Sequence, residues 1–289
     1  MTLTWPVVLA VLFGALLHAS WNALIKSSAD KALDTAVIHL CASVLALPLL
    51  GWAGLPPPEA WPYLAASLVI HVGYYTALVG AYEHGDLGLT YPIMRGVAPL
   101  LVALGSSVVI GETPSLAAWL GIAGITAGVV LVGLAHPGEA LHHRKALAFA
   151  LANAAIIAVY TLVDGRGVRV AGQAIPYVML LFVLFVLDGV AYPMLVWLRR
   201  DAPGRRDLLH GARRRWPLAM LGAGASIGSY AIALWAMTRA PVATVAALRE
   251  TSVLFAALLG TLLLKERFGV QRALGTGVVV AGVMALRWG

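Results

Sequence analysis

Two arginines stand inside long apolar segments of this 289-residue chain, Arg95 and Arg249. An arginine at membrane depth costs roughly 2.5–3.5 kcal/mol on insertion scales, so it faces protein or water rather than lipid. A guanidinium group presents a planar fork of donors that matches a carboxylate. The two arginines could therefore line a cavity and bind a substrate carboxylate. Alternatively, each has a structural role and ties down helix carbonyls or a neighbouring acid such as Glu250.

Aromatic side chains with polar tips recur at helical spacing. His71, Tyr75 and Tyr82 fall on one stripe of a helix, and a shift of 155 residues matches Tyr75 to Tyr230. Such residues suit a cavity that stacks on a flat substrate, although helix packing or an interfacial aromatic belt gives the same pattern. The candidate substrate-binding residues are Trp21, Asn22, His71, Tyr75, Tyr82, Tyr91, Arg95, Tyr160, Tyr230, Trp235, Arg249 and Glu250.

Three groups are candidates for carrying protons: His18, His71 and Asp188. Imidazole titrates near neutral pH, and an intramembrane acid is a functional candidate by default. Asp188 could equally pair with a basic group or remain protonated without a role.

Enzyme motifs give no convincing match. Asp164 begins a segment like a phosphatidyltransferase motif, but that motif requires alanine where Val168 stands. The sequence contains no phosphate-binding loop, no H-E-x-x-H and no G-x-S-x-G. We therefore expect no enzymatic activity, no cofactor and no metal site.

Composition indicates that these residues lie in a membrane. The chain is 61% hydrophobic and 11% charged, whereas soluble domains carry about 25% charged residues. The net charge of +7 does not indicate nucleic-acid binding, because the basic residues cluster in short loops between apolar segments. A membrane-spanning helix needs about 20 residues. Ten such segments are predicted: 4–25, 34–53, 62–83, 87–110, 115–134, 146–164, 174–198, 216–237, 242–264 and 269–287.

An internal repeat organises the ten segments. Residues 87–132 align without a gap to 241–286, and 11 of the 46 positions are identical, including Arg95/Arg249 and Glu112/Glu266. Because the copies are five spans apart, an odd number, they must have opposite orientations in the bilayer. The sequence therefore predicts an all-α polytopic membrane protein. Its ten transmembrane helices form two inverted five-helix repeats, residues 1–138 and 139–289.

The copies also differ, and the differences indicate where gating and substrate choice should be sought. Gly96 aligns with Glu250, and Pro92 and Pro99 have no proline counterparts. Because proline kinks helices, we expect the fourth span to bend more than the ninth and to act in gating. Small residues permit close helix packing in the fifth and tenth spans. These are Gly121, Gly124, Gly128, Gly275 and Gly282.

Two five-span halves, with Gly111-Glu112 and Lys265-Glu266 before glycine-rich spans, resemble the drug/metabolite transporter superfamily of the EamA type. The resemblance implies a carrier of small metabolites or drugs that works by alternating access in the bacterial inner membrane. It also implies that the fifth and tenth spans pack the halves together, away from the transport path. Within the family, the aromatic candidates look most like the YddG-type exporters of aromatic amino acids. Small four-span relatives couple to protons through a carboxylate in the first span, which this chain lacks.

Loop charge predicts the orientation. Loops after odd-numbered spans carry thirteen Lys and Arg residues and the other face carries four, so the positive-inside rule places both termini outside the cytoplasm. We expect an exporter of amino acids, including aromatic ones, that acts as a monomer. Its partners are a small-molecule substrate and the lipid bilayer, with no nucleic acid. The alternatives are a multidrug or other metabolite carrier, an intramembrane enzyme or a lipid scramblase.

Overall fold

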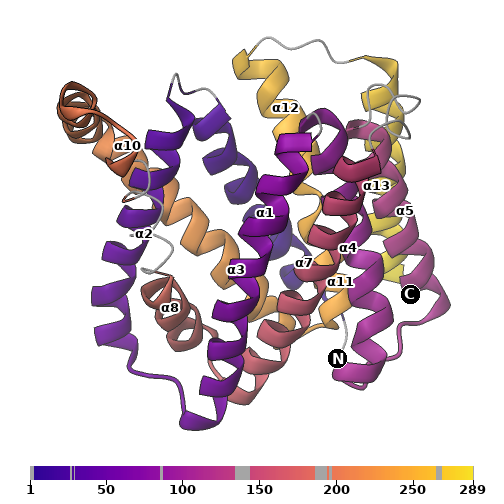
Figure 1. Cartoon of the computed structure of the whole chain (residues 1–289). Helices are drawn as coiled ribbons and strands as arrows, with labels where there is room; N and C mark the ends of the chain where they lie inside the picture. Colours follow the sequence, from indigo (N-terminus) through magenta and orange to yellow (C-terminus); the bar gives the residue numbers. More distant parts are fainter. Residues whose placement is uncertain are drawn as a thin grey trace.

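The computed structural model describes residues 3–26, 28, 30–84, 87–133, 144–185, 194, 197–264 and 269–288, and their regular structure is all helical (Figure 1). In chain order the helices are α1 (Trp5–Lys26), α2 (Lys31–Ala53), the 3₁₀ turn η1 (Pro58–Ala60), α3 (Trp61–His84), α4 (Leu87–Val109), α5 (Leu116–Gly133), α7 (Arg144–Ala171), α8 (Ala174–Leu184), α10 (Ala202–Met237), α11 (Val242–Arg249), α12 (Ser252–Leu264) and α13 (Val270–Trp288).

The helices suit a lipid environment in length and in surface. Backbone groups in lipid must be hydrogen-bonded within the segment, which a helix achieves. Large apolar side chains are also exposed on the surface: Phe13 is 55% exposed. Six described segments are long and apolar enough to cross a bilayer: Trp5–Lys26, Leu33–Ala53, Thr90–Val109, Arg144–Ala171, Ala202–Met237 and Val242–Leu262.

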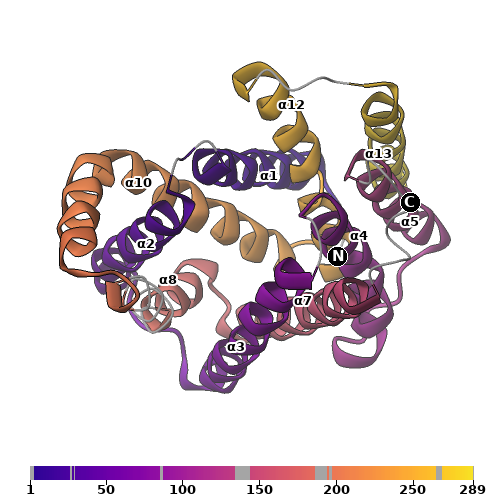
Figure 2. The same ribbon diagram turned by 45° about the horizontal axis from the view of Figure 1, so that its top comes forward.

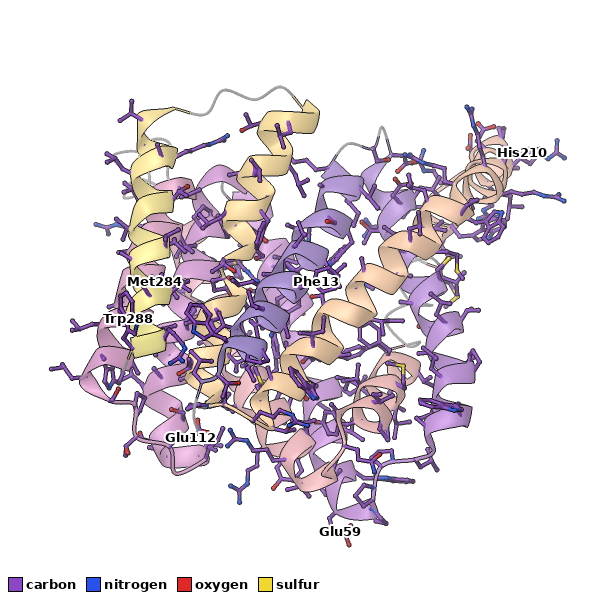
Figure 3. The ribbon with its side chains drawn as sticks, turned by 180° about the vertical axis from the view of Figure 1, so that it is seen from behind. Phe13, Glu59, Glu112, His210, Met284 and Trp288 are labelled. Carbon is purple, nitrogen blue, oxygen red and sulfur yellow. The ribbon has the colours of Figure 1, made fainter. Side chains whose placement is uncertain are left out.

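The bundle has two distinguishable ends. In Figure 3, Glu59 and Glu112 lie at one end and His210 lies at the other. The described ends of the chain lie at the first end, because Leu3 and Trp288 line one cavity together with Glu112, and the Arg287 guanidinium stands 5.3 Å from the Trp5 ring centroid. We call this the terminal end. The opposite end, which carries the arginine-rich start of α10, is the arginine end.

Helices α5 and α13 show that the repeats are inverted. A Cβ atom added to Gly121 would lie 2.9 Å from the Gly282 carbonyl oxygen, and one added to Gly128 would lie 2.7 Å from that of Gly275. The helices are therefore antiparallel and almost touch, as Figure 1 shows at its right edge. In the alignment, Gly121 corresponds to Gly275 and Gly128 to Gly282. The two contacts are thus equivalent under a twofold axis in the membrane plane, which confirms the inverted arrangement.

The remaining helices repeat the same pairing. Helix α3 packs against α7, and its counterpart α10 packs against α1. Helix α4 packs against α7, and its counterparts α11 and α12 pack against α1. Figure 2 shows α1, α3, α4, α7 and α10 around a common centre, with α5 and α13 to one side. The helices of both halves therefore bring residues to that centre.

The ninth span, rather than the fourth, is interrupted. Helix α4 continues through Pro92 and Pro99, whereas the ninth span is divided into α11 and α12 around Glu250 and Thr251. At the break the Glu250 and Thr251 amides bond to carbonyls three residues back, and the Thr251 hydroxyl donates to the Leu248 carbonyl at 2.7 Å. Such tightened turns mark hinges and functional sites. The interruption therefore falls in the ninth span while α4 is continuous, and the expected bend of the fourth span and gating by its prolines stay predictions.

Helix α7 is longer than the sixth predicted span. It runs from Arg144 to Ala171, and 28 residues rise about 42 Å, more than the hydrocarbon core. The sequence prediction ended this span at residue 164. The longer helix places Asp164 within the fold, where it is fully buried.

Helix α10 joins the arginine-rich connection to the eighth span. The helix begins at Ala202, where Asp201 Oδ1 accepts a hydrogen bond from the Gly204 amide at 2.9 Å. The connection between the predicted spans 174–198 and 216–237 is therefore largely helical. Pro217 lies inside the helix, and proline removes a backbone hydrogen bond. Figure 2 shows that the first part of α10 points in a different direction from the rest.

Candidate functional site

A group of aromatic rings lies where the two halves meet. The His71 ring of α3 lies 4.6 Å from the Tyr160 ring of α7 and 4.6 Å from the Phe185 ring that follows α8. The Phe182 ring continues the contact to Tyr230 of α10 at 6.2 Å. Edge and tilted ring pairs of this kind present both aromatic faces and polar tips. We call this group the aromatic cluster: His71, Tyr74, Tyr160, Phe182, Phe185 and Tyr230.

The two repeat-related arginines are in different electrostatic settings. Arg95 Nε lies 2.8 Å from Glu250 Oε2, and both residues are buried, with exposed fractions of 8% and 4%. This pair joins the two halves, because α4 belongs to the first and the break to the second. The Arg249 guanidinium instead lies over the Tyr230 ring, 5.3 Å from its centroid. Among the described residues, no carboxylate lies at ion-pair distance from Arg249.

Arg249 borders a small hollow between α1, α10 and α11. Three residues after Arg249, at the break between α11 and α12, the Ser252 hydroxyl is buried. It has no hydrogen-bond partner among the described residues. A buried polar atom without a partner calls for an explanation, and a bound ligand is one. The hollow is lined by Val11, Gly14, Ala15, His18, Ser229, Ala233 and Arg249.

The first helix contributes polar groups close to this hollow. The His18 and Trp21 rings meet edge to face at 5.4 Å. The Asn22 amide group donates to the His18 carbonyl at 2.7 Å, which fixes its direction. Trp21 Nε1 is buried and has no hydrogen-bond partner among the described residues. Trp21 therefore offers a hydrogen-bond donor, whereas the amide nitrogen of Asn22 is already engaged.

Asp164 is a central residue that the sequence prediction missed. Its carboxylate accepts hydrogen bonds from the hydroxyl groups of Tyr177 at 3.0 Å and of Tyr230 at 2.5 Å. Tyr230 therefore contacts Asp164 with its hydroxyl and Arg249 with its ring face. The rule that an intramembrane acid is a functional candidate would have identified Asp164, had the sixth span been extended past residue 164.

A second polar group joins the halves at the terminal end. Glu112 Oε1 lies 2.6 Å from Arg169 Nη2, and Glu112 Oε2 accepts from the Val242 amide at 2.8 Å. Arg169 also donates to the carbonyls of Met237 and Ala240. We call these five residues the terminal network. It ties the α4–α5 connection to α7 and to the turn before α11, beside a cavity of about 690 Å³ that Glu112 and Arg169 help to line.

The other predicted site residues have different placements. Trp235 lies beneath the Arg239 guanidinium, 5.1 Å away, and makes no described ring contact with the aromatic cluster. Tyr91 is half-buried and lies within electrostatic range of Arg95 and Glu250. The predictions for Asp188 and for the side chains of Tyr75 and Tyr82 fall outside the described residues.

An inverted pair of helical repeats, with an arginine beside a broken central helix, is the architecture of a secondary transporter. The model of the EamA-like transporter family matches residues 5–134 and 144–288. The chain therefore belongs to the EamA-like transporter family, a family of carriers rather than enzymes, and it is a multi-pass membrane protein that transports small metabolites.

One solved structure, described only as a crystal structure of a protein, is similar over almost the whole chain. Its TM-score is 0.74 at 18% sequence identity, covering 97% of this chain and 96% of that one. At this identity the likeness shows the fold alone. A search of curated protein sequences gave no match.

Proposed function

We propose that the protein is an exporter of amino acids, including aromatic ones, that acts as a monomer in a bacterial inner membrane. The observation that supports this proposal most directly is that Arg249 lacks a carboxylate partner. Its guanidinium is half-buried beside the break in the ninth span and has no carboxylate at ion-pair distance among the described residues. A substrate carboxylate would supply the missing partner.

The chemistry of Arg249 favours a carboxylate over a neutral group. A guanidinium binds a carboxylate through two parallel hydrogen bonds, which adds geometric selectivity to charge. Hydrogen bonds to charged groups contribute about 1.5–3 kcal/mol. Arg95 is less suited to the same role because Glu250 already occupies it at 2.8 Å.

The aromatic cluster supports a substrate with a flat or apolar side chain. His71 and Tyr160 are buried, and their rings lie close to those of Phe185 and Tyr74. Offset and edge contacts with such rings contribute about 0.5–1.5 kcal/mol beyond the area buried. A substrate ring inserted next to them would make the same kind of contact.

Alternating access would require the terminal network to open. Glu112 and Arg169 hold the α4–α5 connection against α7 and the α10–α11 turn in the conformation described. The break between α11 and α12 provides a hinge near Arg249. With the arginine end in the cytoplasm, the terminal network would close the outer side.

Uptake into proteoliposomes tests the proposal. Purified protein is reconstituted and supplied with labelled amino acids, a lipophilic cation and an uncharged metabolite, with and without a pH gradient, and protein-free liposomes serve as the control. We expect uptake of aromatic amino acids above the control. Transport of the lipophilic cation alone would favour a multidrug carrier, and no amino-acid transport by folded protein would contradict the proposal.

A further inference from the structure

Asp164, which is fully buried, and Arg249, which is half-buried, carry complementary charges that do not meet each other. Asp164 is fully buried, and no arginine or lysine among the described residues lies at ion-pair distance from it. Arg249 likewise has no carboxylate at that distance. Burying an uncompensated charge is costly, so buried charges normally acquire a partner. Each of these two residues therefore lacks a partner of opposite charge and can bind one.

Tyr230 connects the two charges. Its hydroxyl donates to Asp164 Oδ2 at 2.5 Å, and its ring lies 5.3 Å from the Arg249 guanidinium carbon. A residue in contact with both sites transmits a change at one to the other, because any movement of its ring alters both contacts. The Tyr177 hydroxyl, on Asp164 Oδ1, holds the opposite side of the carboxylate.

The surroundings of Asp164 are otherwise weakly charged. From α3, His71 faces it and is anchored by a contact of 2.8 Å between its Nδ1 and the Ser67 carbonyl. Tyr160 lies one turn away on α7, Tyr177 faces it from α8 and Tyr230 from α10. The arginine of α4, Arg95, is paired with Glu250 of the break. Arg249 is thus the remaining unpaired cation near the aromatic cluster within the described residues.

We propose that Asp164 and Arg249 together form a site for a zwitterion, and that a proton and the substrate ammonium group compete for Asp164. The substrate carboxylate binds Arg249 and its ammonium group replaces the Tyr230 hydroxyl on Asp164. This inference rests on the proposed function and assigns it a substrate class and a driving ion. The protein is then a proton/amino-acid antiporter.

The exchange balances in atoms and protons, and each cycle moves one net positive charge inward. On the outer side, the substrate leaves and the Asp164 carboxylate takes one proton from water to become a carboxylic acid. On the inner side, that proton returns to water as the ammonium group of the next substrate takes its place. One proton therefore enters for each zwitterion that leaves. The pH gradient across a bacterial inner membrane drives export in this direction.

Proton release on binding is the direct test. Full-length protein in detergent, in weakly buffered solution with a pH-indicating dye, is mixed with phenylalanine or with 3-phenylpropionate, which lacks the ammonium group. We expect release of up to one proton per bound phenylalanine under mildly acidic conditions, and none with 3-phenylpropionate. Asp164→Asn should abolish the release and weaken phenylalanine binding about tenfold or more, with phenylpropionate binding changed less than about twofold.

Matched variants keep the test decisive. Asp34→Asn removes another buried acid, which pairs with Arg215 away from this site, and should release protons like the wild type. Asp164→Glu retains a carboxylate and should restore release if Asp164→Asn is impaired in folding. Phenylalanine binding without proton release, or release that persists in Asp164→Asn, would overturn the proposal.

A ligand-free measurement separates this inference from the proposed function. Infrared difference spectra between acidic and alkaline buffer should contain a carboxylic acid band that is lost in Asp164→Asn. If the wild type binds no amino acid but the band is present, the amino-acid function fails while Asp164 remains a proton site. If the band is absent, the proton site is refuted whatever the substrate.

Discussion

At the scale of single residues, the two repeat-related arginines have different partners. The sequence placed Arg95 and Arg249 at equivalent positions and left open whether each lines a cavity or pairs with a neighbouring acid. The structure shows the acid pairing for Arg95, with Glu250, and leaves Arg249 over Tyr230. The aligned pair Gly96/Glu250 was the signal in the sequence that the copies differ here. Its consequence could not be predicted, because pairing depends on how α4 and the break approach each other.

The Arg95–Glu250 pair should be strongly stabilising relative to either single charge. Glu250→Gln leaves a buried guanidinium without compensation, which costs about 3–5 kcal/mol in comparable pairs. Combining Arg95→Gln with Glu250→Gln removes both charges and should recover most of the loss. The measurement is the free energy of unfolding in detergent. Arg200→Gln, which removes a half-exposed pair with Asp30, should change it by about 1 kcal/mol or less.

If the double variant is no more stable than Glu250→Gln alone, the two side chains do not interact as described. If Glu250→Gln lowers the free energy of unfolding no more than Arg200→Gln does, the Arg95–Glu250 pair is not shielded from water. Either result would remove the reason for assigning the substrate carboxylate to Arg249 rather than Arg95.

At the scale of helices, the sequence predicted which segments form helices. It did not predict where a helix is interrupted or how far it extends. Each of the ten predicted spans corresponds to helical structure in the described residues, because long apolar runs leave the backbone no other choice in lipid. The break in the ninth span was missed because it contains no proline or glycine. At the break, Glu250 forms an ion pair with Arg95, and the Thr251 hydroxyl donates a hydrogen bond to the Leu248 carbonyl. Asp164 was missed because the end of α7 was placed seven residues too early.

Close packing of α5 on α13 gives a sharp stability prediction. A Cβ atom at Gly275 would lie 2.8 Å from the Val132 amide nitrogen, whereas one at Gly277 has nothing within 4 Å. Both substitutions gain the same helix propensity, so Gly275→Ala and Gly277→Ala differ only in packing. We expect Gly275→Ala to lower the free energy of unfolding by about 1–3 kcal/mol. Thermal unfolding in detergent measures this, and equal stability of the two variants would contradict the described approach.

The terminal network should control access from the terminal end. Glu112→Gln removes the ion pair with Arg169 and weakens the contact with the Val242 amide. A loss of about 1.4 kcal/mol increases the open fraction tenfold. The readout is the rate at which a membrane-impermeant maleimide labels a cysteine at the buried Thr244, in a Cys41→Ser background.

Labelling should accelerate about tenfold in Glu112→Gln and stay unchanged in Arg200→Gln, which removes an ion pair at the arginine end. An unchanged rate in Glu112→Gln would mean that this network does not hold the terminal end closed. Equal acceleration in both variants would indicate general loosening instead of a gate.

At the scale of the whole molecule, inversion is the feature that the sequence predicted best. A gapless repeat across five spans requires opposite orientations, and the reciprocal contacts of Gly121 with Gly282 and Gly128 with Gly275 meet that requirement. What the repeat could not reveal is its broken symmetry. The halves differ in the break beside Arg249, in the Arg95–Glu250 pair and in the position of Asp164. If each half adopts the conformation that the other half has here, the site becomes accessible from the opposite side of the membrane.

Counterflow in proteoliposomes tests most directly whether Arg249 receives the carboxylate of a transported amino acid. Vesicles loaded with unlabelled phenylalanine take up labelled phenylalanine in competition with external phenylalanine or phenylalaninamide. We predict that the wild type prefers the acid by about tenfold or more, and that Arg249→Gln loses this preference. Arg239→Gln, which removes a guanidinium over Trp235, should keep it. Equal competition by acid and amide in the wild type, or an unchanged preference in Arg249→Gln, would contradict the assignment.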